Sequence, residues 1–137
     1  TITICGSMIF SEKMLEAQKI LQDQGHTVYV SGPIAEYVGI SEEQKTVLTL
    51  HHKNTQDVMR QHCALIDKSN AILVLNYDRK GIVGYIGGNT FLEIGYAHIF
   101  YKKIYLLNPI PSIEYYRSEI EAVQPVILNG DLDNLTL

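Results

Sequence analysis

The feature that most constrains the fold of this chain is the run AILVLN at residues 71–76. It is apolar at every position before its final asparagine, so neither of its faces is suited to water. A run of this kind is typical of a central strand in a parallel sheet, which helices cover on both faces. The run therefore predicts an α/β fold built around a buried sheet.

Predicted strands and helices alternate along the rest of the sequence. The other strand-like runs are short and apolar, and they lie at residues 1–5, 26–32, 103–108 and 125–129. Segments with helical spacing of apolar residues lie at 11–25, 41–68, 90–100 and 113–122.

Local signals mark the ends of some of these helices. Ser11 is expected to cap the start of the first helix, and Gly25 to end it. The segment 41–68 opens with Ser41 and Gln44, the signature of a capping box. This segment forms either one long helix or two shorter ones, and the sequence leaves both open.

The alternation predicts a single domain over residues 1–137 with a flavodoxin-like (Rossmann-like) three-layer sandwich. Right-handed crossovers would place helices on both faces of a five-stranded parallel sheet. The expected strand order is 2-1-3-4-5.

The composition excludes several classes of protein. With 46% apolar and 19% charged residues, the chain is globular and not disordered. Its net charge of -4 argues against nucleic acid or an anionic membrane as a partner. No apolar stretch reaches the roughly 18 residues needed to cross a bilayer, and the opening residues read as a strand and not as a signal peptide. We therefore expect a cytoplasmic protein.

No metal site is predicted. Cys5 and Cys63 lack the spacing of metal ligands, and the five histidines form no H-x-x-x-H pair with a nearby acid. We expect the two thiols to be unpaired in a reducing compartment, with a disulfide as the alternative.

The expected ligand site lies beyond the carboxyl ends of the strands, where the strand order reverses. The segments CGSMIF, NYDRKG and LNPIP follow the first, third and fourth strands, so they should meet there. The amino ends of the following helices point to the same crevice and favour anions and hydrogen-bond acceptors.

The loop after the first strand predicts no cofactor. It has neither the G-x-G-x-x-G pattern of a dinucleotide site nor a nucleoside triphosphatase P-loop, and a flavin-phosphate loop would be richer in Ser and Thr. Asn76 stands where a response regulator would need an aspartate. Gly6 and Ser7 either contact a ligand or only form a turn, and the sequence leaves both open.

Glu93 is the single charge in the apolar stretch YIGGNTFLEIGYAHIF, residues 85–100. In one interpretation, Thr90 and Glu93 form a T-x-x-E capping box at the start of a helix. In the other, Glu93 faces the crevice as a nucleophile that the first helical turn keeps ionised, and Gly87 and Gly88 let the backbone approach the ligand. Such a carboxylate can attack an anomeric carbon to form a covalent glycosyl-enzyme.

The motifs CGSM at residues 5–8 and FLEIGYA at residues 91–97 resemble those of the nucleoside 2-deoxyribosyltransferase superfamily, which includes the 2′-deoxynucleoside 5′-phosphate N-hydrolases. The resemblance spans most of the chain. It implies a flavodoxin-like fold and cleavage of the N-glycosidic bond of a (deoxy)nucleoside or its monophosphate.

The resemblance also implies roles for single residues. The family's nucleophilic glutamate falls on Glu93, and the loop serine that meets the 5′ group in the hydrolases falls on Ser7. The chain departs from the family where a tyrosine, two aspartates and the hydrolases' arginine fall on Thr3, His62, Gly87 and Ile9.

Other residues could fill these roles. Tyr77 or Tyr85 could replace the tyrosine. Asn76, Asp78 and Asn89 are nearby polar substitutes for the aspartates, or else ordinary turn and cap residues.

The predicted function is therefore cleavage or transfer at the N-glycosidic bond of a nucleoside or nucleotide, and the alternative is a non-catalytic nucleotide- or nucleoside-binding module of the same fold. The catalytic residue is Glu93, and the predicted substrate-binding residues are Gly6, Ser7, His62, Asn76, Gly87, Gly88 and Asn89. The resemblance further implies a homodimer or larger homo-oligomer. The apolar segment 96–101 and the segment 41–68 could form its interface, or could pack in the core.

Overall fold

The computed structural model describes residues 1–137 and contains a five-stranded sheet in which all strands are parallel. In the order of pairing, the strands are β2 (Val28–Tyr29), β1 (Ile2–Cys5), β3 (Ala71–Val74), β4 (Lys103–Leu106) and β5 (Val126–Ile127). The order 2-1-3-4-5 confirms the predicted flavodoxin-like arrangement. β1 lacks only Thr1 of its predicted run, and the other four strands end before their runs do, which continue into the loops beyond the last paired residues.

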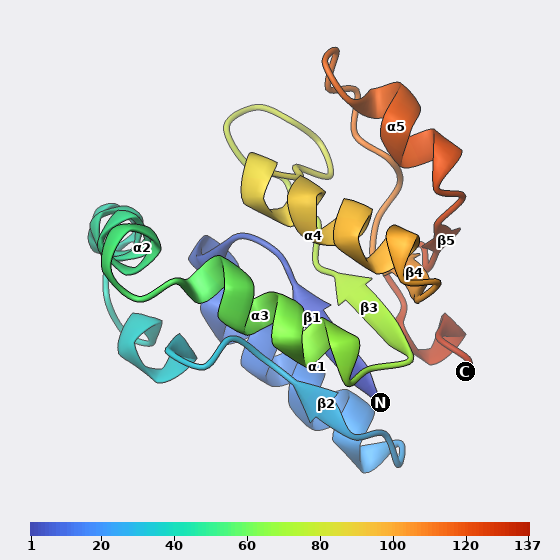
Figure 1. Ribbon diagram of the computed structural model, residues 1–137, viewed down its shortest axis with the longest axis horizontal. Helices are drawn as coiled ribbons and strands as arrows, with labels where there is room; N and C mark the ends of the chain where they lie inside the picture. The colour runs from blue at the N-terminus through green and yellow to red at the C-terminus, as the bar shows by residue number, and fades with distance from the viewer.

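Helices cover both faces of the sheet (Figure 1). Figure 1 shows α3 and α4 across the near face and α1 behind the sheet, while α2 stands at the side. The helices are α1 (Ser11–Asp23), α2 (Glu42–Thr55), α3 (Val58–Asp67), α4 (Gly88–Ile99) and α5 (Arg117–Ala122), with short 3-10 turns η1 (Met8–Phe10), η2 (Ile34–Tyr37) and η3 (Leu132–Asn134).

The apolar run in β3 explains why the core has two halves. Successive side chains of a strand point to opposite faces. Leu73 therefore packs with α1 residues such as Leu21 in one cluster of buried side chains. Val74 packs with Ile66 of α3 and Ile94 of α4 in the other. This arrangement is the predicted three-layer sandwich.

The segment 41–68 forms two helices. Asp57 lies between α2 and α3 with φ of 49°, a left-handed conformation that an α-helix does not contain. The predicted capping box is confirmed at the start of α2, where the Gln44 amide donates to Ser41 Oγ at 3.1 Å and the Ser41 amide donates to Gln44 Oε1 at 2.8 Å.

The first helix begins differently from the prediction. Ser11 is the first residue of α1 and not its cap, because η1 runs directly into the helix with Phe10 at the N-cap position. Gly25 follows the helix with φ of 97°, as expected of a glycine that ends it.

Asn76 joins the ends of β3 and β4. Its side chain is fully buried, and its Nδ2 donates to the carbonyl oxygens of Asn108 at 2.8 Å and Pro109 at 3.1 Å. Its Oδ1 accepts from the Asn108 amide at 2.9 Å, and Asn108 Nδ2 donates back to the Asn76 carbonyl at 3.1 Å. Every polar atom of the Asn76 side chain is therefore used by the loop after β4.

We expect Asn76→Ala to lower the free energy of unfolding by about 3 kcal/mol, because it leaves buried backbone groups of that loop without partners. Urea denaturation would measure the loss. Asn54→Ala, on the exposed surface of α2, is the matched control and should change stability by less than about 0.5 kcal/mol. Equal stability of the two variants would contradict a structural role for Asn76.

The helices are short compared with the thickness of a bilayer. None combines the length and the hydropathy that a membrane span requires.

Candidate active site

Two adjoining cavities lie at the carboxyl end of the sheet, where the loops after β1 and β3 meet. The larger has a volume of about 400 Å³ and the smaller a volume of about 50 Å³. Residues that line both are Gly6, Met8, Thr49, Lys53 and Asn89, so the two cavities form one site. The site lies at the predicted crevice, although the loop after β4 lines neither cavity.

The helix that carries Glu93 begins earlier than the capping box requires. α4 starts at Gly88 with Gly87 at the N-cap, and no side chain caps it. Thr90 is therefore already inside the helix, and Glu93 lies in the second turn. The predicted Thr90–Glu93 capping box is wrong, and Glu93 has no capping role to explain its presence.

The Glu93 carboxyl group lies at the wall of the smaller cavity with only 5% of the residue exposed. Burial raises its pKa to about 8, and a hydrogen bond with Cys5 and the charge of Lys53 offset only part of that effect. The prediction that the helix start keeps Glu93 ionised is therefore also wrong. The helix dipole acts mainly within the first turn, and Glu93 lies beyond it.

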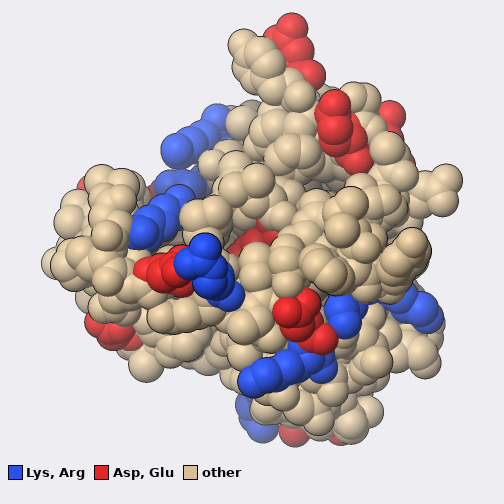
Figure 2. Space-filling view, in the orientation of Figure 1, with Lys and Arg blue, Asp and Glu red and all other residues tan.

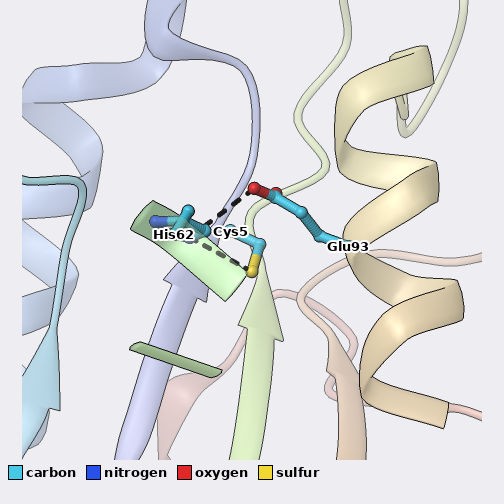
Figure 3. Close-up of side chains that lie close together, drawn as sticks. All are labelled: Cys5, His62 and Glu93. Carbon is cyan, nitrogen blue, oxygen red and sulfur yellow. Dashed lines mark hydrogen bonds and ion pairs between the residues drawn. The ribbon is translucent and has the colours of Figure 1, made fainter. Parts of the chain in front are cut away.

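Cys5 and His62 surround the Glu93 carboxyl group (Figure 3). The three side chains come from the end of β1, from α3 and from α4, and they point toward one another. His62 Nε2 lies 3.6 Å from Cys5 Sγ and 3.8 Å from Glu93 Oε2. Burial raises the pKa of the Cys5 thiol and lowers the pKa of His62, so all three groups are neutral at pH 7.

A further contact fixes the proton on the His62 ring. Nε2 lies 3.1 Å from the carbonyl oxygen of Ile4, which can only accept a hydrogen bond. The neutral ring therefore carries its proton on Nε2. The Cys5 thiol can then donate a hydrogen bond to the Glu93 carboxylate when Glu93 ionises.

The same three residues contain the atom types that bind zinc. Cys5 Sγ, His62 Nε2 and a Glu93 oxygen lie within 4.8 Å of one another, a grouping that the sequence did not predict because the residues are distant in the chain. A metal would need the lone pair of Nε2, whereas the contact with Ile4 requires a proton there. The cluster fits a neutral hydrogen-bonded group better than a metal centre.

The loop after β1 forms the turn that the sequence allowed, and it also lines the cavities. Gly6 has φ of 153°, and a Cβ there would lie 3.2 Å from both the Leu75 carbonyl oxygen and Met14 Cε. Ser7 caps η1 by accepting a hydrogen bond from the Ile9 amide at 3.3 Å. Gly6 lines both cavities and Ser7 lines the larger one, so this turn also forms a wall of the site.

The loop after β3 contains a tight hairpin. Arg79 and Ile82 exchange two backbone hydrogen bonds, of 3.1 and 2.9 Å. Lys80 and Gly81 between them have φ of 54° and 73°, the positive values of a type I′ turn. The Gly84 amide also donates to Asp78 Oδ1 at 2.9 Å. These bonds hold the Arg79 side chain over the larger cavity, and Asp78 serves the loop itself.

The start of α4 supplies the remaining predicted residues. Gly87, Gly88 and Asn89 line the larger cavity. Asn89 Oδ1 is buried without a hydrogen-bond partner, so it can accept a hydrogen bond from a ligand. Tyr85 also lines this cavity, whereas Tyr77 does not and packs edge-on against Phe10 with 5.2 Å between ring centroids.

Not every predicted residue is in the site. Asn76 lines neither cavity, and its bonds to the loop after β4 make it a structural residue, contrary to the prediction. Thr3 is also outside the site, with its hydroxyl bonded to Ser69 Oγ at 2.6 Å. Of the two tyrosines predicted as possible substitutes, Tyr77 and Tyr85, only Tyr85 lines the larger cavity.

Sequence reasoning missed three cationic residues of the site. Lys53 was expected on a solvated helix face, yet it lines both cavities. Arg79 and Lys80 line the larger cavity. The signal for Arg79 and Lys80 was their place in the segment NYDRKG directly after β3. No pattern in α2 marked Lys53, because the orientation of α2 depends on its packing against η1.

Comparisons with protein-family models, with curated proteins and with solved structures gave no match for this chain. The strand order and the layers define the fold class, and the residues that line the cavities define the chemistry that the site can perform.

Proposed function

We propose that this protein cleaves, or transfers at, the N-glycosidic bond of a (deoxy)nucleoside or nucleoside monophosphate, with Glu93 as the nucleophile. The observation that carries the proposal is the position of Glu93. It is a buried carboxyl group at a cavity wall, and the only basic side chain within ion-pair distance is His62, which is neutral. A structural carboxylate would be paired with a cation or exposed to water.

The reaction has two steps. In the first, a Glu93 oxygen forms a bond to the anomeric carbon while the bond from that carbon to the base nitrogen breaks. The base leaves with the bonding electron pair and takes a proton from solvent, since Glu93 is the only acidic residue that lines either cavity. In the second step, water or another base attacks the anomeric carbon, loses a proton to solvent and releases the Glu93 carboxylate.

Burial of Glu93 favours this chemistry once the group is ionised. A carboxylate without a shell of water or a counter-ion interacts strongly with the positive charge that develops on the sugar in the transition state. The Cys5 thiol then donates a hydrogen bond to this carboxylate. The low ionised fraction at neutral pH reduces the rate and gives it a characteristic pH dependence.

We expect kcat/KM for base release to rise with pH and to level off above a pKa of about 8 in the free protein, because only ionised Glu93 can act as the nucleophile. The measurement is chromatographic detection of free base from a panel of ribo- and deoxyribonucleosides and their 5′-monophosphates between pH 5 and 9. A rate that falls with rising pH would contradict the nucleophile and would instead indicate that protonated Glu93 donates to the leaving base.

A binding module without turnover is the second candidate. The observation in its favour is that neither cavity has a second carboxyl group to protonate a leaving base. This candidate predicts heat of binding in calorimetry with no free base from any compound of the panel. Base release that requires Glu93 would exclude it.

We also propose a homo-oligomer that binds a small nucleoside or nucleotide. Support comes from exposed apolar side chains in the two segments that sequence analysis singled out. Val47 and Leu50 of α2 are 70% and 62% exposed, and Ile99 at the end of α4 and Tyr101 after it are 68% and 96% exposed. Val47 and Leu50 also line the larger cavity, so a second copy on α2 would lie next to the substrate.

A further inference from the structure

The larger cavity is lined by basic residues and by no acidic residue. Lys53 reaches it from α2, and Arg79 and Lys80 from the hairpin after β3. In Figure 2, basic side chains gather between α2 and the loop that precedes α4. The chain as a whole has a net charge of -4, so this concentration of positive charge is local. Apposed cations are unfavourable unless an anion or a hydrogen-bonding ligand lies between them.

Arg79 has unused hydrogen-bonding capacity. Its side chain is only 15% exposed, and its Nε is buried without a hydrogen-bond partner. Its nearest acid is Glu42 at the start of α2, with 3.7 Å between Nε and Glu42 Oε1. Its Nη1 lies 3.4 Å from Ser7 Oγ, and its guanidinium lies 5.5 Å from the centre of the Tyr85 ring. The group is held in place, and its ion pair with the exposed Glu42 carboxylate is long, so its positive charge is only partly neutralised.

The surroundings of Arg79 provide further donors. Ser7 can turn its hydroxyl toward the cavity, and the first residues of α4, from Gly88 on, line the same cavity with backbone amides that have no partner within the helix. A guanidinium fork, a hydroxyl and helix amides are the groups that bind phosphate oxygens. Lys53 and Lys80 add positive charge without fixing the orientation of the anion.

We propose that Arg79, Ser7, Lys53 and Lys80 form a phosphate subsite, so that the substrate is a nucleoside 5′-phosphate and not a free nucleoside. This inference rests on the proposed function for the identity of the sugar, and on the cavity alone for the phosphate. The smaller cavity with Glu93 shares its wall with the larger one, so a sugar at the junction would have its anomeric carbon toward Glu93 and its phosphate toward Arg79. The cations come from α2 and from the loop after β3, while the loop after β1 contributes Ser7 and the apolar Ile9.

The test measures binding of two sugars, 2′-deoxyribose and 2′-deoxyribose 5-phosphate, to the Glu93→Gln protein by calorimetry. Neither probe contains a base, so the result does not depend on base preference or on turnover. We expect the phosphorylated sugar to bind at least 30-fold tighter, roughly the value of one charge-assisted hydrogen bond, and to bind more weakly as salt is raised. Equal affinity of the two sugars would overturn the subsite.

Substitutions then test the residues. Arg79→Gln should weaken binding of the phosphorylated sugar by about 10- to 100-fold and leave the other sugar unchanged. The matched control is Arg60→Gln, which removes the same charge from an exposed position on α3 and should have no effect. Unchanged binding by folded Arg79→Gln protein would overturn the assignment.

Glu42→Gln separates binding from structural support. If phosphate and Glu42 compete for Arg79, removing the Glu42 charge should tighten binding of the phosphorylated sugar about threefold, the size of an exposed ion pair. If the pair with Glu42 only holds α2 in place, the same variant should weaken binding, which would overturn the proposal. This variant also decides the question if Arg79→Gln fails to fold.

The two proposals can fail separately. Base release at equal rates from nucleosides and from monophosphates would contradict the phosphate subsite but not the assignment of Glu93 as the nucleophile. Tighter binding of 2′-deoxyribose 5-phosphate than of 2′-deoxyribose, with no base release from any substrate, would contradict the proposed function but support the phosphate subsite.

Discussion

Glu93→Gln is expected to lower the rate of base release by at least about 1,000-fold. The amide has nearly the shape of the carboxyl group but cannot form the ester bond to the anomeric carbon. No other lining residue can replace it, because both cavities lack a second carboxylate. Initial rates at pH 8.5, measured with the substrate that wild-type protein cleaves fastest, give the comparison, since wild-type Glu93 is mainly ionised there.

The control for this variant is Glu119→Gln, an exposed position on α5 that should leave the rate unchanged. Binding of 2′-deoxyribose 5-phosphate to Glu93→Gln should also persist, because the cations of the larger cavity are unaltered. Activity of Glu93→Gln within tenfold of wild type would contradict the nucleophile. Loss of both rate and binding would indicate that Glu93 supports the shape of the cavity.

The fold could be predicted because its signals are local and redundant. The run 71–76 has no polar face, and alternating strands and helices leave few topologies. The break between α2 and α3 could not be predicted, because it depends on the left-handed conformation of Asp57 and not on a proline or glycine. The short β2 likewise ends at Tyr29 although the apolar run continues to Val30.

The nature of the site depended on details that spacing does not encode. Thr90 and Glu93 have the spacing of a capping box, but α4 starts two residues before Thr90, with Gly87 at the N-cap and Gly88 as its first residue. Glycine has a low helix propensity, so the sequence did not indicate this earlier start. The raised pKa of Glu93 comes from packing against β1 and α3, which are distant in sequence. The position of Glu93 at the ligand crevice was predictable, because the topology alone places the start of α4 there.

The positively charged residues of the site could not be predicted from the sequence for a similar reason. Lys53 and Arg79 belong to different segments, and only the orientation of α2 against the hairpin after β3 brings them to one cavity. Asn76 shows the opposite error. It ends the central strand at the expected place, yet its amide points along the sheet edge and bonds to the loop after β4.

Glu93→Gln should also stabilise the fold, and increasingly so as pH rises. The pKa of Glu93 is raised from 4.5 in the unfolded chain to about 8 in the folded protein. Between these values the unfolded chain releases a proton that the folded protein keeps, so the stability of the wild type falls as pH rises through this window. The shift corresponds to as much as about 5 kcal/mol at pH 8 and above, and to almost nothing at pH 4.

Glutamine carries no charge at any of these pH values, so the free energy of unfolding of Glu93→Gln should not fall as pH rises through this window. Urea denaturation of both proteins at pH 5 and at pH 8.5 measures the difference, and we expect the variant to gain several kcal/mol over the wild type only at the higher pH. Glu119→Gln should track the wild type at both, because its carboxyl group is exposed in the folded protein. A gain of equal size at both pH values would mean that the amide packs or bonds better than the carboxyl group. A loss at pH 8.5 would show that ionised Glu93 is stabilised within the fold, contrary to the effect of its burial.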